Sequence, residues 1–372
     1  MSILVLTSDT KEKGGVGNYY NCLKLNLEKD IDYFFVNNAG TTSIMHPGNI
    51  SKWENIQKTI SLLSKYLKFI FMAPRYKLIH INPSLTPHSF YRDLIFILLS
   101  KLYRKNILIF FRGWDENFED KISHSGFLSY LFKKTFGSVD RIIVLGKVFE
   151  NKLLQMGARP SKNIILESTV ADTTFMEGFS IDEKITSYDD CVKFLFIARI
   201  LRSKGIYIAI DAFVEAQRIL TNRSMKLYIA GEGEELNDAK SYVQNNKFNN
   251  IYFVGDARND VKKTLLHNCH IMLFPTYHGE GMPNCILEGM LYGMPIISRI
   301  NAGIPDVVGH QINGLLTNSI DSAEFSRFCI NLASDKQLYK KMAKINLFHA
   351  IESFSTEKVR KRILKLYNEA RF

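Results

Sequence analysis

Two carboxylates eight positions apart mark the stretch of this sequence best suited to chemistry. Glu280 and Glu288 lie in the run HGEGMPNCILEGMLYG, where an apolar segment precedes the second glutamate. The residues that directly follow the first glutamate are Gly281, Met282, Pro283 and Asn284. Pro283 suits the first turn of a helix, because its missing N–H is not needed there. We therefore expect Glu280 on a loop and Glu288 about a turn and a half into the helix that follows.

The residues just before this motif complete a possible anion site. Ile271 to Thr276 (IMLFPT) is typical of a buried strand. A strand, a glycine-containing loop and a helix N-terminus together offer free backbone N–H groups and a partial charge of about +0.5. The alternative is a plain helix start, since acidic residues are favoured near any helix N-terminus and Glu288 alone would be an ordinary solvated residue.

A second pair of charges follows another buried strand. Val192 to Ala198 is apolar, and Arg199 and Lys204 come directly after it, with Gly205 before the next helix. Two cations five positions apart at the carboxyl end of a strand can both reach one diphosphate. Ordinary surface charge is the alternative interpretation.

A glycine-rich loop occupies the equivalent place near the start of the chain. It follows the strand Ile3 to Thr7 and contains Gly14, Gly15 and Gly17. Glycine lets a backbone approach a ligand closely, and a loop between a strand and a helix is where a phosphate binds. The spacing is GG-x-G rather than G-x-G-x-x-G, so a tight turn explains it equally well.

Short apolar strands alternate with helices through both halves of the chain, which predicts parallel, doubly wound sheets. Ligands bind beyond the carboxyl ends of such strands. His80, Arg112 and Asp115 lie at strand ends in the first half. His80 is also explained as a structural histidine with local hydrogen-bond partners. Arg112 could contact a phosphate or an acceptor, but it cannot act as a general base because it does not deprotonate.

The length of 372 residues, 46% of them apolar, favours two domains. We expect an N-terminal domain over residues 1–175, to which residues 355–372 return as a helix, and a C-terminal domain over 190–354. Val170 to Asp190 lacks periodicity and is locally acidic, which is typical of an interdomain linker. The five scattered cysteines lack metal-binding spacing and indicate a reducing compartment.

The net charge of +11 is concentrated in the first half of the chain. Residues 1–170 contain 23 Lys and Arg against 14 Asp and Glu, a net charge of +9. Such a basic half favours an anionic partner, such as a membrane surface or a phosphorylated substrate, although a solvated basic face is the alternative. No nucleic-acid-binding signature is present, so nucleic acid is not expected as a partner.

The start of the sequence, MSILVLTSDT, lacks the features of a signal peptide, and the longest apolar run, Leu94 to Ser100, is too short to span a bilayer. We therefore expect a cytoplasmic protein that is soluble or peripheral on the inner face of the cytoplasmic membrane. No metal site is expected. Asp30 and Asp32 form a D-x-D, but they lie between a helix and a strand, at the end of the sheet away from the ligand side.

The segment EGMPNCILEGMLYGMPII resembles the E-x7-E motif of retaining glycosyltransferases of family 4, which have the GT-B fold. The pattern A-R-x4-K-G at Arg199 and Lys204 resembles the diphosphate clamp of that family, and the GG-x-G loop resembles its donor-phosphate loop. The resemblance covers nearly the whole chain and is most specific from Arg199 to Gly314. It implies two Rossmann-like domains facing a cleft, with the last helix crossing back to the N-terminal domain.

The resemblance also assigns roles. Glu280 would face the donor sugar, Glu288 would hold the ribose, and the turn at Gly255 and Asp256 would contact the base. The family usually has a histidine where this sequence has Arg112, so the role of that histidine is in doubt here. The implied activity is retaining transfer from a nucleotide-sugar to a glycan or a polyprenyl-diphosphate-linked acceptor, in bacterial surface polysaccharide biosynthesis, without a cofactor or metal.

Two other functions remain open. One is a non-catalytic sugar-nucleotide-binding protein. The other is a dinucleotide-dependent oxidoreductase, which is disfavoured because the sequence has no G-x-G-x-x-G with an acidic residue about twenty positions on.

Overall fold

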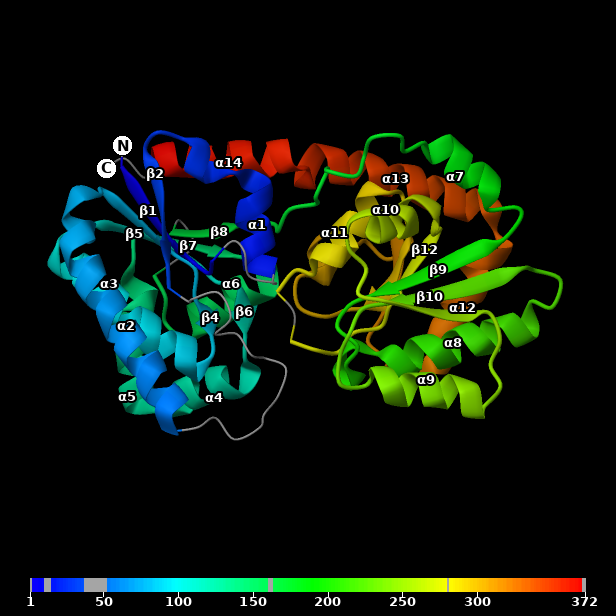
Figure 1. Ribbon diagram of the computed structural model, residues 1–372, viewed down its shortest axis with the longest axis horizontal. Coiled ribbons are helices and arrows are strands. Elements are labelled where there is room, and N and C mark those ends of the chain that lie inside the picture. The colour runs from blue at the N-terminus through cyan, green and yellow to red at the C-terminus, as the bar shows by residue number, and fades with distance from the viewer. Residues whose placement is uncertain (1, 10–14, 37–51, 160–162, 280, 370–372) are drawn as a thin grey trace. The chain divides into compact units, whose positions relative to one another are not determined.

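Short apolar runs in the first half of the chain form one parallel sheet in the computed structural model, which describes residues 2–9, 15–36, 52–159, 163–279 and 281–369 (Figure 1). The sheet has six strands in the order β2-β1-β3-β5-β7-β8. The strands are β1 (Ile3–Thr7), β2 (Ile31–Phe35), β3 (Leu78–Ile81), β5 (Asn106–Phe110), β7 (Arg141–Val144) and β8 (Ile164–Leu166). Every residue of β1 and β3 is buried, as expected for parallel strands covered on both faces.

The helices of this sheet are α1 (Gly15–Leu23), α2 (Lys52–Met72), α3 (Pro87–Leu102), α4 (Glu116–His124), α5 (Gly126–Lys134), α6 (Lys147–Gln155) and the last helix, α14 (Thr356–Glu369). A small parallel pair, β4 (Ser84–Leu85) and β6 (Gly113–Trp114), adds to the carboxyl side of β3 and β5. Because the chain runs outward from β1 to β2 and then back to β3, the sheet has its topological switch between β1 and β3.

The second half repeats this plan with the strand order β11-β10-β9-β12-β13-β14. Its strands are β9 (Val192–Ile197), β10 (Met225–Ala230), β11 (Ile251–Gly255), β12 (Ile271–Phe274), β13 (Ile296–Arg299) and β14 (Gly314–Thr317). Its helices are α7 (Ile181–Ser187), α8 (Ile206–Ile219), α9 (Leu236–Asn245), α10 (Asn259–Asn268), α11 (Asn284–Leu291), α12 (Ser322–Ser334) and α13 (Lys336–Phe354). The topological switch lies between β9 and β12, which pair directly.

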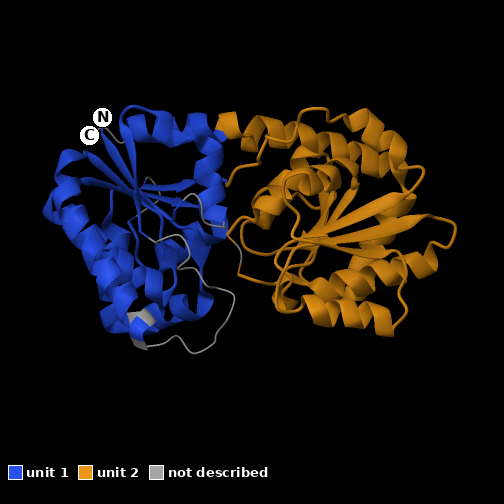
Figure 2. Cartoon of the chain, viewed as in Figure 1, with its two compact units in different colours: residues 1–168, 359–372 blue, residues 169–358 orange. Residues whose placement is uncertain are grey.

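Figure 2 shows the two compact units that these sheets define. Unit 1 comprises Met1–Ser168 and Val359–Phe372, and unit 2 comprises Thr169–Lys358. Most of α14 therefore belongs to unit 1. It is attached there by an ion pair between Arg362 and Glu167 and by a 2.6 Å hydrogen bond between Tyr367 Oη and His80 Nδ1.

Val170 to Asp190, which we expected to link the two domains, is instead part of a folded unit. It lies within unit 2 and contains α7, whose Lys184 is buried. Ser180 begins the helix by accepting a hydrogen bond from the backbone N–H of Glu183. Two of the acidic residues of this stretch, Asp182 and Glu183, lie in the first turn of α7, where a negative charge interacts favourably with the helix dipole.

Some smaller features of unit 1 differ from the expectations, and one agrees with them. The sequence predicts that the first helix runs to about Glu28, but it ends at Leu23, because Lys24 adopts a left-handed backbone with φ of 48° before a short 3-10 turn over Leu25–Leu27. Helix α4 and the β4–β6 pair were not expected from the sequence. Asp30 and Asp32 lie at the amino end of β2, as expected for residues away from the ligand side. No helix in the described ranges is both long and apolar enough to cross a bilayer.

Candidate functional site

The loops after β9 and β12 meet at the topological switch of unit 2, and both carry residues that the sequence singled out. Arg199 follows β9 and is exposed. Lys204 ends a short 3-10 turn and is only 8% exposed, with its Nζ 5.9 Å from the centre of the Phe274 ring at the end of β12. The structure therefore places Lys204 against the end of β12, where it is buried, and leaves Arg199 exposed to solvent.

Gly205 fixes the path of this loop. Its φ is +82°, and a Cβ atom on it would lie 2.3 Å from the carbonyl oxygen of Pro275. Only glycine tolerates both the left-handed backbone and this close approach. Two hydrogen bonds tie the same loops together, from Tyr277 N–H to the Ser203 carbonyl at 2.9 Å and between Ser203 Oγ and His278 Nδ1 at 3.1 Å. Lys204 is thus held at a fixed place beside the end of β12.

The segment Gly281 to Pro283 after β12 is also held by hydrogen bonds to other parts of unit 2. The carbonyl of Gly281 accepts a 2.9 Å hydrogen bond from Gly303 N–H, and the carbonyl of Met282 accepts one of 3.4 Å from Thr169 Oγ1. Pro283 is the N-cap of α11 and Asn284 its first residue. Glu280 lies outside the described residues. The loop that would carry it is anchored on its carboxyl-terminal side.

The N-terminus of α11 has no side-chain cap, since Pro283 offers no hydrogen-bonding side chain. The first backbone N–H groups of a helix lack intrahelical partners, and the helix dipole adds positive potential at that end. The end of α11 follows β12 and so faces the same edge of the sheet as Lys204. This edge has the positive character that a diphosphate requires.

Glu288 lies one turn further along α11, in a helix as the motif predicts, and its side chain is buried rather than solvated. Its Oε1 is 2.7 Å from Nζ of Lys262 on α10. Burial raises the pKa of Glu288 above its ordinary value, while Lys262 acts to lower it. Burial would lower the pKa of Lys262, but the charge and hydrogen bond of Glu288 outweigh it and raise that pKa. The carboxylate is therefore held in place by a lysine.

Sequence reasoning missed Lys262, because its importance depends on the packing of α10 against α11. It also missed two glycines in the run GEGEE after β10. A Cβ on Gly231 would lie 1.8 Å from the Ala198 carbonyl oxygen, and one on Gly233 would lie 2.3 Å from that of Ile200. These glycines let the loop after β10 pack directly against the loop that carries Arg199. Glycines after a predicted strand were the available signal.

The turn assigned to the nucleotide base follows β11. Gly255 has a φ of +78°, and its carbonyl accepts a 2.7 Å hydrogen bond from Gly231 N–H. Asp256 is partly exposed and forms an ion pair with Arg258. The hydrogen bond joins this turn to the loop after β10, so three neighbouring loops at the carboxyl edge of unit 2 are linked.

In unit 1, Gly15 is the first residue of α1 and is exposed, while Gly14 lies outside the described residues. Arg112 follows β5 and lies between two aromatic rings. Its guanidinium carbon is 3.6 Å from the Phe110 ring centre and 3.9 Å from that of Tyr19. Its Nε donates to Asn82 Oδ1 at 2.9 Å. The structure therefore places a stacked, oriented cation at the carboxyl end of the unit 1 sheet.

His80 is fully buried in β3, one strand from Arg112. Burial, together with the charge of Arg112, holds the pKa of His80 well below its ordinary value. Its Nδ1 is bonded to Tyr367 of α14. This environment gives His80 a neutral ring that joins β3 to the last helix.

Asp115 has a local structural role. It is the N-cap of α4, and its Oδ1 accepts hydrogen bonds from the N–H groups of Asn117 and Phe118 at 3.0 and 3.3 Å. The structure brings Arg112 and Asn82 together, whereas Asp115 is directed to its own helix. Within the part of the chain that the structure describes, no group of three or more His, Cys, Asp or Glu side chains is arranged to hold a metal ion.

Comparison with known proteins shows what the second unit is similar to. Residues 179–346 match the family described as Glycosyl transferases group 1. An uncharacterized glycosyltransferase of Methanocaldococcus jannaschii, MJ1069, is 25% identical over 246 residues, which cover 64% of this chain and 62% of that protein. The putative colanic acid biosynthesis glycosyltransferase WcaL of Salmonella typhimurium is 23% identical, over 60% of this chain and 56% of its own length. The matched part of the chain thus spans about three fifths of the length of these curated relatives.

Among solved structures, Anabaena HepE in complex with UDP and glucose superposes with a TM-score of 0.72 at 15% sequence identity, covering 99% of this chain and 100% of HepE. This likeness concerns the fold, and it confirms the expected pair of Rossmann-like parallel-sheet domains. Residues 179–346 therefore match the glycosyltransferase group 1 family, within a chain that has the two-domain GT-B fold of HepE.

Proposed function

We propose that this protein is a retaining, metal-independent glycosyltransferase that moves a sugar from a nucleotide-sugar donor to a glycan or a polyprenyl-diphosphate-linked acceptor. The observation that carries the proposal is the edge of unit 2 at which Lys204, the uncapped N-terminus of α11 and the buried Glu288 occur on loops and a helix that follow neighbouring strands. This edge combines positive potential for a diphosphate with a carboxylate for sugar hydroxyls.

The donor is assigned to unit 2. Arg199 and Lys204 bind the diphosphate, Glu288 accepts hydrogen bonds from the ribose, and the turn at Gly255 and Asp256 lies against the base. Glu280, with the backbone of the motif that follows it, contacts the sugar. HepE, which shares the fold, has been solved with UDP and glucose, which supports a uridine nucleotide as the first donor to test.

Transfer requires stabilisation of the negative charge that develops on the leaving diphosphate. Lys204, Arg199 and the α11 N-terminus supply this charge from fixed positions, as preorganised electrostatics. Retention of configuration follows from front-face attack. In this step the acceptor oxygen bonds to the anomeric carbon on the face from which the diphosphate leaves, and the acceptor proton passes to the leaving phosphate oxygen.

The acceptor is assigned to unit 1, whose sequence is strongly basic. Arg112 is the best-placed residue to contact a phosphate, since it is stacked and oriented at the carboxyl edge of the sheet. His80 and Asp115 support this region through α14 and α4 respectively. The similarity to WcaL, a putative colanic acid biosynthesis glycosyltransferase, supports a role in polysaccharide biosynthesis.

A thermal-shift screen over nucleoside diphosphates and their sugars tests the proposal. A ligand at a hundred times its dissociation constant adds about 2.7 kcal/mol of apparent stability. We expect one nucleoside diphosphate and its sugar to stabilise unit 2, and the sugar-nucleotide to be consumed in the presence of EDTA once an acceptor extract is added. Binding without consumption would favour a non-catalytic sugar-nucleotide-binding protein. Stabilisation by NADH alone would favour an oxidoreductase.

A further inference from the structure

The outward face of α3 is apolar, in contrast to an ordinary surface helix. From Tyr91 to the end of this helix at Leu102, every residue that is exposed carries a large apolar side chain. These residues are Tyr91, Ile95, Leu98 and Leu102. Their spacing of four, three and four places them on one face, opposite the buried Phe96 and Ser100. A helix that is apolar on both faces has something covering its outer face.

Helix α2 presents a second apolar stripe. Its members recur every three or four residues and are Trp53, Ile56, Ile60, Leu63, Leu67 and Phe71. Trp53 is 74% exposed and Phe71 75%. The residues that face the sheet instead are Tyr66 and Phe69, so the stripe is not part of the core. Helix α5 adds the exposed Phe127 and Tyr130.

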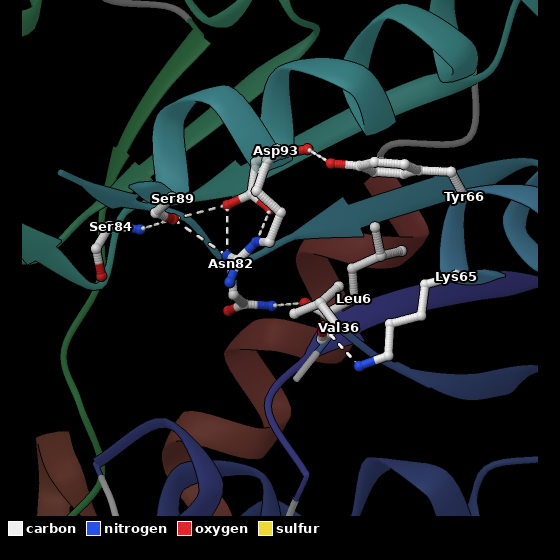
Figure 3. A network of polar contacts seen from close by, with 9 residues as sticks. Leu6, Val36, Lys65, Tyr66, Asn82, Ser84, Ser89 and Asp93 are labelled. Atoms are coloured by element: carbon white, nitrogen blue, oxygen red, sulfur yellow. Dashed lines mark hydrogen bonds and ion pairs between the residues drawn. The ribbon is translucent and has the colours of Figure 1, made fainter. Parts of the chain in front are cut away.

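The three helices are fastened to one another. Tyr66 Oη on α2 donates to the carbonyl of Arg92 on α3 at 3.1 Å, and Lys101 Nζ on α3 donates to the carbonyl of Lys134 on α5 at 2.8 Å (Figure 3 shows the α2–α3 contact). Right-handed crossovers in the order β2 to β3 to β5 to β7 place α2, α3 and α5 on the same face of the sheet. The stripes therefore lie on one side of unit 1, and exposed apolar residues that gather on one side of a protein mark interaction sites.

The charge around the stripes indicates the partner. Residues 52–105, which include α2, α3 and the strand between them, contain ten Lys and Arg and only two Asp and Glu, a net charge of +8. One of the two acids, Asp93, is buried and paired with Arg92. Lys58 and Lys68 are exposed on α2, and Lys133 and Lys134 are exposed on α5. A second copy of this chain would bring like charges together, which disfavours a dimer through this face.

We propose that α2, α3 and α5 of unit 1 form a docking surface for an anionic lipid bilayer. The apolar stripes enter the boundary between head groups and acyl chains, while the lysines contact lipid phosphates. Each basic residue near an anionic surface contributes about a fivefold gain in partitioning, and the gain fades with salt. The choice of a membrane agrees with the lipid-linked acceptor of the proposed function, but the attachment itself requires no turnover.

Trp53 provides a direct probe, because the chain has two tryptophans and the other, Trp114, is buried. Vesicles of phosphatidylglycerol and phosphatidylcholine should shift Trp53 emission to the blue, and lipids brominated on the acyl chains should quench it. Trp53→Phe should abolish both signals while the protein still co-sediments with the vesicles. No shift in the wild type during full co-sedimentation would place the stripe outside the membrane and overturn the proposal.

Variants separate the two contributions. Leu98→Ser with Leu102→Ser should weaken co-sedimentation at least about tenfold, because two leucines lose their burial. Lys58→Glu with Lys68→Glu should weaken it by more than about 25-fold, because two fivefold contributions are lost, and should reduce its salt dependence. The matched control is Ile312→Ser with Ile320→Ser, which alters two equally exposed isoleucines in unit 2 and should bind as the wild type does.

Three further results would overturn the proposal. They are equal binding to phosphatidylcholine alone, unchanged binding by the leucine variant, and a stable dimer in light scattering that the leucine variant dissociates. Calorimetry of nucleoside diphosphate binding should be unchanged in all these variants. Loss of vesicle binding with intact nucleotide binding therefore concerns this surface, whereas absent nucleotide binding in the wild type concerns the proposed function.

Discussion

Lys262 on α10 and Glu288 on α11 form an ion pair in which Nζ and Oε1 are 2.7 Å apart and the carboxylate is buried. The pair joins α10 to α11, and it fixes the carboxylate that we assign to the ribose. A ribose hydroxyl that binds there donates to an oxygen already oriented by the lysine. Lys262 is thus a positioning residue for Glu288.

Replacing Lys262 should leave a buried, unpaired carboxylate. We expect Lys262→Met to lower the free energy of unfolding by about 3 kcal/mol at pH 7.5. The pKa of Glu288 is already raised by burial, and it should rise further without the lysine. A raised carboxyl pKa gives stability at low pH that is lost as the pH rises through it, so the deficit should shrink at pH 4.5.

Urea denaturation at both pH values measures this effect. Lys263→Met, on the next position of α10, is the matched control and should change the stability by less than about 0.5 kcal/mol. A deficit for Lys262→Met that is the same at pH 4.5 and pH 7.5 would contradict the assignment.

A buried histidine gives a second pH dependence, of opposite sign. Burial, with the charges of Lys184 and Lys193, lowers the pKa of His270 to about 3. Its Nδ1 accepts a 3.0 Å hydrogen bond from the backbone N–H of Lys193, and its Nε2 lies 3.1 Å from Ser187 Oγ. A depressed histidine pKa gives stability that is present above the ordinary pKa and lost as the pH falls, by about 2 kcal/mol between pH 7 and 5.

His270→Gln should therefore flatten the decline in unfolding free energy between pH 7 and 5. His124→Gln changes an exposed histidine and should leave the decline as it is in the wild type. Equal slopes for the wild type and His270→Gln, measured by urea denaturation, would show that the ring does not titrate as its environment indicates.

Gly205 should be irreplaceable for a steric reason. In Gly205→Ala the new methyl group would meet the Pro275 carbonyl at 2.3 Å, so the loop that carries Lys204 must move. We expect a loss of a few kcal/mol of stability, since both the left-handed backbone and the contact are unfavourable. Nucleoside diphosphate affinity should fall as well.

Gly178→Ala is the matched control. Gly178 also has a positive φ, of +77°, but nothing lies within 4 Å of the position of its Cβ. This variant should show the backbone cost of about 1–2 kcal/mol alone and keep its nucleotide affinity. Calorimetry that finds equal nucleotide affinity in both variants would mean that the loop path at Gly205 does not position the clamp.

The sequence predicts the two parallel sheets and part of the candidate site, because the patterns that indicate them are local. The buried strands, the place of Glu288 in a helix and the strand-end position of Lys204 all follow from patterns of a few residues. Helix α7 was missed although Ser180 and Glu183 have the spacing of a capping box, because the acidic composition suggested a linker. The ion pair of Glu288 with Lys262 spans 26 positions and exists only once α10 packs on α11, so no local pattern could reveal it.

The sugar-transfer rate of a Glu280 variant tests the catalytic role that we propose for this residue. Glu280→Ala should abolish sugar transfer, with a rate loss of about 10²–10³, or roughly 3–4 kcal/mol, because a contact to the donor sugar in the transition state is lost. The fold and the thermal shift with nucleoside diphosphate should persist. Glu215→Ala, on the exposed face of α8, is the control. Near-normal turnover of a folded Glu280→Ala variant would rule out the assigned role.

The most direct test of the account is calorimetry of a nucleoside diphosphate against its nucleoside, beginning with UDP and uridine. The wild type should bind UDP far more tightly than uridine. Arg199→Ala and Lys204→Ala should each weaken UDP binding by about 1.5–3 kcal/mol, because each removes a charge-assisted contact to the diphosphate, and should leave uridine binding unchanged. Equal losses for UDP and uridine, or no preference for any nucleoside diphosphate in the wild type, would contradict the assignment of unit 2 as a nucleotide-sugar site.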